Sequence, residues 1–252
     1  MGFRGSSSRR RQSARGRGRS PESRFSPAHS SRRMPVDTDA DAFDDLAPSD
    51  REALGALRED DLLGPVIDRH GPLTVDPAPD PFERLVVSIL RQQVSMASAE
   101  ATRERLFDAV EVTPEGLLAA DEATLKDAGL SRQKTRYVRN VAEAFADNDW
   151  NTEAFAAMSD DEVREELTAI TGVGEWTADM QLLFTLGRPD VFPVGDLGVR
   201  KGMEELYGRE MSRGEMVEEA ERWAPYRSYA SLYLWRAKED IAASVDEVVG
   251  EE

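Results

Sequence analysis

The stretch ITGVGEWTADMQLLFTLGRPDVFPVGDLGVRKG, residues 170–202, decides the fold of this chain. It places a glycine-spaced turn, Gly172-Val173-Gly174, between two segments whose apolar residues recur at helical spacing. Glycine at both positions permits positive φ angles and lets a ligand approach the backbone closely. The start of the second helix offers free N–H groups to an anion such as phosphate. The stretch therefore predicts two helices joined by a tight, anion-binding hairpin.

A lone acid, Asp196, follows the hairpin after about one more helix length, behind the extended run 191–194. As a structural residue it would cap a helix predicted over 197–207, which is a common position for aspartate. As a functional residue, an acid near a phosphate-binding turn suggests chemistry on a nucleic acid. The two roles are compatible.

The chain from residue 49 onward carries helical signals and few others. Asp80-Pro81-Phe82-Glu83 is typical of a helix start, with an acid at the N-cap, proline at N1 and glutamate at N3. Further helix starts are predicted at Ser95, Thr113, Ser131, Ser159, Asp196 and Ser212. Strand-like alternation is nearly absent, with residues 73–75 and 191–192 as the short candidates. We predict an all-α protein.

The formal charge of the chain is −17 at pH 7, and it is unevenly spread. Residues 1–33 contain ten arginines and one acid, whereas the remainder contains 22 basic and 48 acidic residues. This acidic body resembles the surfaces of proteins from salt-accumulating halophiles. Without that explanation it would argue against DNA as a partner, because phosphate contacts supply most non-specific affinity. The overall charge therefore does not decide the function, and the local distribution of charge must. Three basic islands interrupt the acidic body, at 132–139, at 200–201 and around Arg222, Arg227, Arg236 and Lys238.

Residues 1–33 are rich in Arg, Ser, Gly and Pro and hold almost no large apolar residues, so they cannot form a core. We predict a disordered tail, or a start assigned too early, because the acidic body begins abruptly at Met34. A basic arm that embraces nucleic acid is the alternative.

The chain has no cysteine, which excludes disulfides, thiolate zinc sites and iron–sulfur clusters. No apolar run approaches membrane-spanning length, and no signal-peptide pattern is present. We therefore expect a soluble, cytoplasmic protein with no membrane partner.

Four stretches together resemble the helix–hairpin–helix superfamily of base-excision DNA glycosylases, and most closely its 3-methyladenine DNA glycosylase II (AlkA-like) branch. They are PFERLVVSILRQQVS at 81–95, GLSRQKTRYV at 129–138, the stretch 170–202 and PYRSYASLYLWR at 225–236. The resemblance implies two helical subdomains with the active cleft between them, one formed by 34–112 with 213–252 and the other by 113–212. It also implies a monomer that acts on damaged double-stranded DNA in the nucleoid.

The resemblance assigns catalysis to Asp196, whose carboxylate would face the sugar of a flipped-out nucleotide and stabilise an oxocarbenium-like transition state. Trp176 stands where the strand-cleaving members carry a lysine, so we expect a monofunctional enzyme without lyase activity. Trp176, Met180 and Tyr226 would line the pocket for the alkylated base, whose positive charge favours an aromatic face. A buried core aromatic is the structural alternative for Trp176.

The resemblance also implies DNA contacts around the hairpin, with Gln93 as the side chain that fills the gap left by the flipped base. The predicted contacts are Gly172, Val173, Gly174, Thr177, Gln92, Gln93, Ser95, Lys134, Arg200 and Arg227. No cofactor or metal is expected, apart from a monovalent cation that family members can hold against the hairpin carbonyls.

Two alternatives remain. One is a related glycosylase for other damaged bases, such as hypoxanthine or oxidised bases. The other is a non-catalytic helix–hairpin–helix module that only holds DNA, although such a module would need neither Asp196 nor an aromatic residue at position 176.

Overall fold

The computed structural model describes residues 41–237. The predicted tail at 1–33 and the basic residue Lys238 lie outside the described residues. Within residues 41–237, no helix combines the length and the apolar character needed to cross a membrane.

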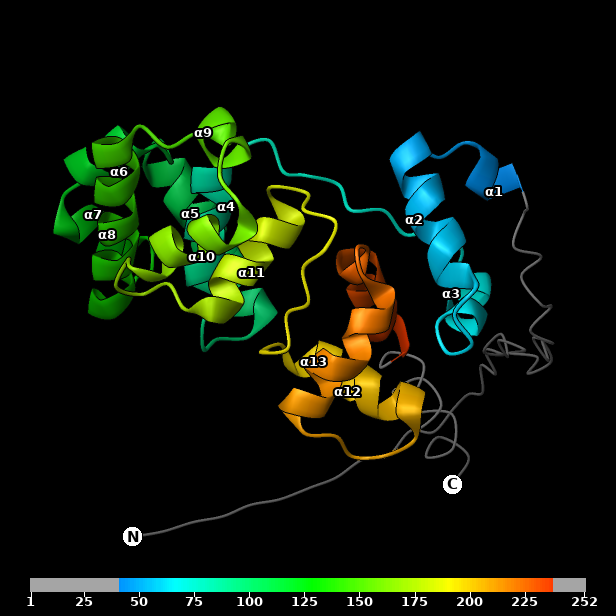
Figure 1. Cartoon of the computed structure of the whole chain (residues 1–252). Helices are drawn as coiled ribbons and strands as arrows, with labels where there is room; N and C mark the ends of the chain where they lie inside the picture. Colours follow the sequence, from blue (N-terminus) through cyan, green and yellow to red (C-terminus); the bar gives the residue numbers. More distant parts are fainter. Residues whose placement is uncertain (1–40, 238–252) are drawn as a thin grey trace, which may run out of the picture. The chain divides into compact units, whose positions relative to one another are not determined.

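The described chain is helical throughout, which confirms the all-α prediction (Figure 1). The extended segments 73–75 and 191–192 form no sheet in the described part of the chain. The helices are α1 (Asp41–Asp44), α2 (Pro48–Arg58), α3 (Gly64–His70), α4 (Pro81–Arg91), α5 (Met96–Ala109), α6 (Pro114–Ala119), α7 (Glu122–Asp127), α8 (Arg132–Asn148), α9 (Thr152–Ala156), α10 (Asp160–Thr168), α11 (Glu175–Phe184), α12 (Leu197–Tyr207), α13 (Arg213–Ala220) and the 3-10 helix η1 (Glu221–Trp223). A further helix begins at residue 227 and is described to residue 237.

The predicted helix starts are confirmed by their caps. The Asp80 side chain accepts a hydrogen bond from the Glu83 N–H group, and Pro81 is the first helical residue of α4. Equivalent side-chain caps are made by Ser95, Thr113, Ser131, Ser159, Asp196 and Ser212. These starts are predictable because a cap is a contact between residues two or three apart in the chain.

The middle of the chain packs around α4. This helix contacts α5, α8 and α11, and Phe82 of α4 meets Phe145 of α8 edge-on with ring centroids 5.2 Å apart. Its apolar stripe is fully buried, as the helical spacing predicts. The residue that caps the end of α4, Gln92, bonds to the hairpin at the Gly172 carbonyl, so α4 ends at the hairpin.

The N-terminal helices contact the helix 227–237. The Tyr229 hydroxyl donates to Asp50 of α2 at 2.6 Å, and the Tyr233 hydroxyl donates to the Gly71 carbonyl at 3.0 Å. By contrast, α4 contacts the later helices α8 and α11, and α5 contacts α7. The division into two subdomains stays a prediction.

Candidate functional site

Asp196 lies at the N-cap of α12, where its Oδ1 accepts a hydrogen bond from the Val199 N–H group at 3.0 Å. The residue before it, Gly195, is exposed, and Asp196 itself is half-buried. The carboxylate therefore lies at the edge of the fold, with one oxygen fixed by the start of the helix.

Two tryptophans converge on this carboxylate. The Trp176 Nε1–H donates to Oδ2 of Asp196 at 2.8 Å, and the Trp235 Nε1–H donates to Oδ1 at 2.8 Å. Trp176 is in the first turn of α11, whereas Trp235 comes from the helix 227–237. Three separate helices thus hold one carboxylate, and each of its oxygens receives an indole N–H.

Gly198 allows Trp235 to reach the carboxylate. A Cβ atom at position 198 would lie 2.5 Å from Cδ1 and 2.7 Å from Nε1 of Trp235, which is closer than real Cβ atoms approach. The indole of Trp235 also stacks on Phe184 at the end of α11, with ring centroids 5.5 Å apart. The position of Trp235 therefore depends on a glycine and on a stacked ring.

The charge of Asp196 is stabilised without being neutralised. Burial alone would raise the pKa of this carboxyl, but hydrogen bonds from Trp235, the Val199 amide, Trp176 and the Gly198 amide hold the pKa below its usual value. All four donors are neutral, and within residues 41–237 no cation forms an ion pair with Asp196. The group is thus ionised at neutral pH and retains its negative charge for a ligand.

One face of α11 lies beside this carboxylate. Trp176, Met180 and Phe184 are four residues apart and share a face. The first bonds to Asp196 and the last stacks on Trp235, so Met180 lies between them, mostly buried at 7% exposure. Trp176 is half-buried and is not part of the packed core. This disfavours the alternative interpretation of Trp176 as a buried core aromatic.

The hairpin is held in place by side chains from two other helices. Gly172 has φ +113°, and a Cβ there would lie 2.4 Å from Cγ of Tyr137, so only glycine fits. The Gln92 Nε2 donates to the Gly172 carbonyl at 3.1 Å, and the Asn140 Nδ2 donates to the Thr171 carbonyl at 2.9 Å. The amide of Gln92 thus anchors the turn.

The hairpin presents free backbone donors. Within the described residues, the N–H groups of Gly172 and Gly174 donate to no acceptor, and Gly174 is exposed with open space around the position of a Cβ. Gly174 does not use the positive φ that glycine permits, because this residue caps α11 in an extended conformation with φ −107°. Val173 and Thr177 are buried at 6% and 2% exposure, so their side chains support the turn from inside.

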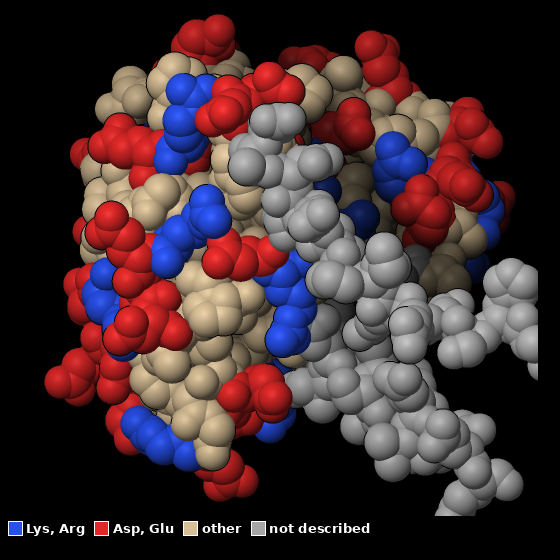
Figure 2. Space-filling view, turned by 90° about the vertical axis from the view of Figure 1, so that its right-hand side faces the viewer, with Lys and Arg blue, Asp and Glu red and all other residues tan. Residues whose placement is uncertain are grey.

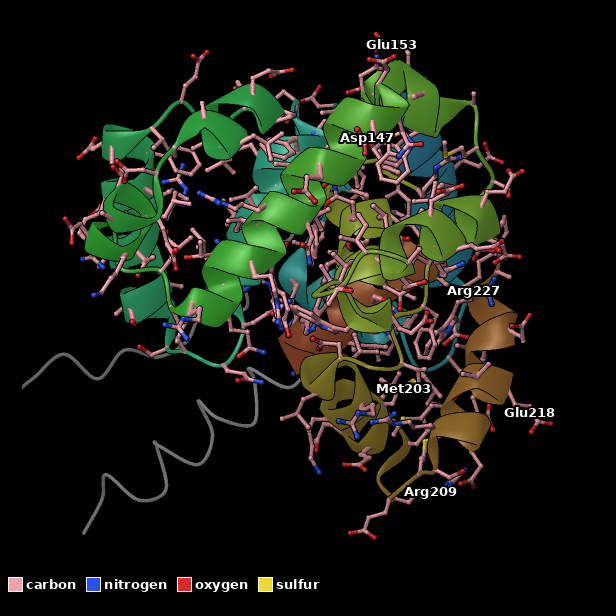
Figure 3. All side chains as sticks on the ribbon, turned by 90° about the vertical axis from the view of Figure 1, so that its left-hand side faces the viewer. Asp147, Glu153, Met203, Arg209, Glu218 and Arg227 are labelled. Carbon is pink, nitrogen blue, oxygen red and sulfur yellow. The ribbon has the colours of Figure 1, made fainter. Side chains whose placement is uncertain are left out.

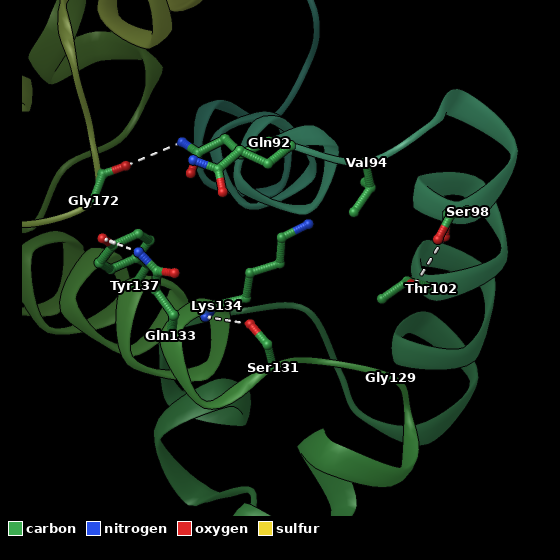
Figure 4. A pocket seen from close by; sticks show the side chains of 11 residues that line it. Gln92, Val94, Ser98, Thr102, Gly129, Ser131, Gln133, Lys134, Tyr137 and Gly172 are labelled. Atoms are coloured by element: carbon green, nitrogen blue, oxygen red, sulfur yellow. Dashed lines mark hydrogen bonds between the residues drawn. The ribbon is translucent and has the colours of Figure 1, made fainter.

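Gln93 is exposed at the end of α4 and has a left-handed backbone with φ +58°. A left-handed residue other than glycine is uncommon and costs on the order of 1 kcal/mol or more. Ser95 caps α5, and the Lys134 ammonium donates to the Leu90 carbonyl at the end of α4. Burial lowers the pKa of Lys134. Gln93 and Lys134 line one cavity together with Gly172 of the hairpin (Figure 4).

The basic islands differ in whether their cations are paired with acidic side chains. Arg227, labelled in Figure 3, lies in the last described helix. It is bound by Asp190 through two contacts of 2.7 and 2.9 Å, and it also contacts Glu221. The Arg200 Nε donates weakly to the backbone oxygen of Asp196, at 3.4 Å. In contrast, no cation of the island 132–139 is paired with an acid in the described part of the chain. Figure 2 shows how basic side chains are interspersed with acidic ones on the face that it presents.

Within residues 41–237, Tyr226 forms no hydrogen bond with Asp196. Its hydroxyl donates to Glu52 at 3.0 Å and its ring meets Tyr229 edge-on. Trp235 is nine residues further along, roughly 13 Å on a helix. Trp235 is therefore the second aromatic residue at the carboxylate, and sequence reasoning missed it although it lies inside the stretch 225–236.

The described residues contain no group of three or more His, Asp or Glu side chains that could hold a metal ion. The hairpin carbonyls of Thr171 and Gly172 each accept one side-chain amide, as given above. A monovalent cation at these carbonyls stays a proposal.

Comparison with known proteins supports one family. A profile described as "HhH-GPD superfamily base excision DNA repair protein" matches residues 86–227, more than half of the chain. An alkylbase DNA glycosidase-like protein of Schizosaccharomyces pombe is 30% identical over 189 residues, and the match covers 70% of this chain and 88% of that protein.

Solved structures agree with this match. A DNA-3-methyladenine glycosidase from Bacillus halodurans has a TM-score of 0.69 at 34% identity, covering 78% of this chain and 92% of that one. The 3-methyladenine DNA glycosylase of Schizosaccharomyces pombe in complex with abasic DNA has a TM-score of 0.65 at 28% identity, covering 73% and 95% of the two chains.

Proposed function

Because this chain belongs to the HhH-GPD superfamily of base excision DNA repair proteins, we propose that it is a DNA glycosylase that removes alkylated purines such as 3-methyladenine. The relatives named above as 3-methyladenine enzymes and the protein solved with abasic DNA support this assignment. The proposed partner is damaged double-stranded DNA, bound by a monomer in the nucleoid.

The observation that carries the proposal is the carboxylate of Asp196, held by neutral donors alone. Cleavage of an N-glycosidic bond develops positive charge on the sugar. A nearby carboxylate that keeps its charge stabilises that transition state, and its fixed donors hold it in place at no cost of reorganisation. Asp196 would also orient the attacking water.

Base selection follows from the aromatic side chains. An alkylated purine carries a positive charge, which is attracted to the π-face of an indole. Trp176 and Trp235, together with Met180, would line the pocket. A cationic base is also a good leaving group, so a poorly basic carboxylate suffices.

We propose that the enzyme is monofunctional. Strand cleavage through a Schiff base needs an amine at the sugar. Position 176 holds tryptophan, and Lys201, which is the first lysine after Lys134, is paired with Glu204. Among the described residues of the site, none therefore supplies the amine that a Schiff base requires.

DNA binding would depend on the hairpin and its surroundings. The free N–H groups of Gly172 and Gly174 bind a phosphate without any side-chain charge, which suits a chain with a net charge of −17. Lys134 and Gln93 lie on the same side of the hairpin and complete the proposed contact surface.

The experiment is release of free base from methylated duplex DNA by the wild type and by Asp196→Asn, at low and at molar salt. We expect release of 3-methyladenine by the wild type and a loss of at least about 100-fold in the variant. Equal release by both proteins would remove Asp196 from catalysis. Binding of DNA without any base release would favour the non-catalytic module.

Strand integrity in the same reactions tests the monofunctional assignment. Intact strands that break only after alkaline treatment are expected. Direct cleavage by the purified wild type would contradict it.

A further inference from the structure

A cavity of about 290 Å³ lies between α4 and α5, and none of the functions assigned above uses it. Its lining comes from α4, from residues 78–80 that lead into this helix and from the first half of α5. Three arginines and three acids line it, namely Arg84, Arg91, Arg103, Asp80, Glu83 and Glu100. The opposite charges are equal in number, but they are not evenly paired.

The three acids of this lining already have partners. The Asp80 side chain caps α4 by accepting a hydrogen bond from the Glu83 N–H group. Both glutamates contact the guanidinium of Arg103, with Glu100 at 3.1 Å and Glu83 at 4.0 Å. One arginine and one helix start therefore engage all three carboxylates.

Arg84 and Arg91 have no such partners. Within residues 41–237, neither guanidinium forms a hydrogen bond or an ion pair. The two residues are seven positions apart on α4, so they share a face, and both are half-buried. Burial and, to a smaller extent, the charge of Arg91 lower the pKa of Arg84. Two partly buried cations thus repel each other at one cavity, in a chain with 49 acidic residues.

An anion at this cavity would offset the repulsion. Each guanidinium presents a planar fork of N–H donors that matches the oxygens of a phosphate group. Two forks that line the same cavity suit a ligand with several charged oxygens. The unpaired arginines therefore have the chemistry of a phosphate site.

The position of the pair indicates the source of the phosphate. Arg91 immediately precedes Gln92, whose side chain bonds to the hairpin. The Arg84 guanidinium lies over the ring of Phe184, 5.6 Å from its centroid, and that ring stacks on Trp235. The pair thus adjoins both the hairpin and the aromatic residues at the proposed catalytic carboxylate. A DNA strand that is held by the hairpin and delivers a nucleotide to those aromatic residues would carry its backbone past the pair.

We propose that Arg84 and Arg91 bind a backbone phosphate of the damaged duplex in this cavity, as a second phosphate site beside the hairpin. The two sites differ in chemistry, since the hairpin offers neutral N–H groups and the arginines offer charge. An acidic chain thereby gains a local pair of cations for DNA. This inference rests on the proposed function, because its ligand is the duplex on which the enzyme acts.

The test is the salt dependence of binding to a duplex that carries a tetrahydrofuran abasic analogue, from which no base can be released. Affinities measured from about 50 to 200 mM salt give the slope of log affinity against log salt, which falls by about 0.9 for each phosphate that is no longer neutralised. The proteins are the wild type, Arg84→Met, Arg91→Met, the double variant and, as a matched control, Arg103→Met. Methionine keeps an apolar stem and removes the charge.

We expect the double variant to lower the slope by about 0.9 and to weaken binding by about 10-fold at low salt, because one charge-assisted phosphate contact is lost. Each single variant should weaken binding less, by about 3-fold. Arg103 lines the same cavity but is paired with two acids, so its variant should change the slope by less than about 0.3. Arg91 is at the end of α4, so its variant tests the site even if Arg84→Met fails to fold.

Equal slopes in the wild type and the double variant overturn the inference. An equal fall in Arg103→Met also overturns it, since that identifies a long-range effect of net charge. Thermal stabilisation by inorganic phosphate that needs both arginines, without any change in slope, would assign the cavity to a free phosphate and contradict the DNA contact. The proposed function fails separately, if the wild type releases no base from methylated DNA. The slope is measured without base release, so the two failures are distinguishable.

Discussion

Asp190 and Asp196 are six residues apart in the connection between α11 and α12, and their surroundings differ in one decisive respect. Asp190 is bound by the guanidinium of Arg227, which contacts both of its oxygens. Asp196 is bound by two indoles and a backbone amide, all of them neutral. The first carboxylate has its charge cancelled and the second keeps it.

The comparison teaches that a low pKa does not by itself mark a functional carboxylate. In both residues burial alone would raise the pKa, and in both hydrogen bonds lower it below the usual value. What differs is whether the donors carry a charge. The cation at Asp190 cancels the charge of that carboxylate, so no negative charge remains for a ligand. The donors at Asp196 are neutral, so its negative charge remains and can stabilise a cationic sugar.

Replacing each aspartate by asparagine should separate these roles. Asp196→Asn should lower the single-turnover rate of base excision by about 100-fold or more, because it removes the charge that stabilises the transition state. The folded fraction of Asp190→Asn should excise the base at a rate within about 3-fold of the wild type. The charge that this substitution removes is already cancelled by Arg227. Similar losses in both variants would contradict the distinction.

The Gly198→Ala variant should disturb Asp196 without touching its side chain. The added Cβ would displace the Trp235 indole, and we expect excision to fall roughly 10-fold through the loss of positioning. Gly202→Ala serves as the control for packing, because its Cβ would press on the Leu234 backbone of the same neighbouring helix. If both variants lose equal activity per folded molecule, the indole has no specific role.

Removing one indole donor should shift the acid limb of the pH–rate profile. Trp235→Phe takes a hydrogen bond from the ionised form of Asp196, so the pKa of this carboxyl rises. The wild type should therefore stay active to lower pH than the variant. An unchanged acid limb in excision assays between pH 4 and 7 would show that the indole does not stabilise the charge.

The smallest effect is expected on stability, at Asp190. Asp190→Asn should lower the free energy of unfolding by about 1–2 kcal/mol at neutral pH, since the ion pair is partly exposed. The folded pKa of Asp190 is lowered, so its stabilisation is present above the unfolded pKa, near 3.8, and is lost as the pH falls through the folded value. Urea titrations at pH 7 and below pH 3.8 should show the difference shrinking with acid.

Local chemistry made much of the fold predictable. Each helix start depends on a cap and a backbone N–H two or three residues away, and the hairpin depends on a glycine with φ +113°. The acid at the start of α12 was predictable for the same reason. Periodicity also predicted which side of α4 is buried.

Long-range contacts could not be predicted in this way. Trp235 reaches Asp196 from 39 residues away, and only because Gly198 leaves room for the indole. Arg227 was expected to contact DNA, but its partner Asp190 is 37 residues distant in the sequence. Tyr226 was expected to line the pocket, but the partner of its hydroxyl, Glu52, is 174 residues distant in the sequence.

The most direct test of the retained charge is the affinity for a cationic mimic of the transition state. Duplexes would carry either a pyrrolidine abasic analogue, which is positively charged, or the neutral tetrahydrofuran. We expect the wild type and Asp190→Asn to prefer the cationic duplex by at least about 10-fold, and Asp196→Asn to lose this preference. Equal affinities of the wild type for both duplexes, or a preference that survives in Asp196→Asn, would contradict the account.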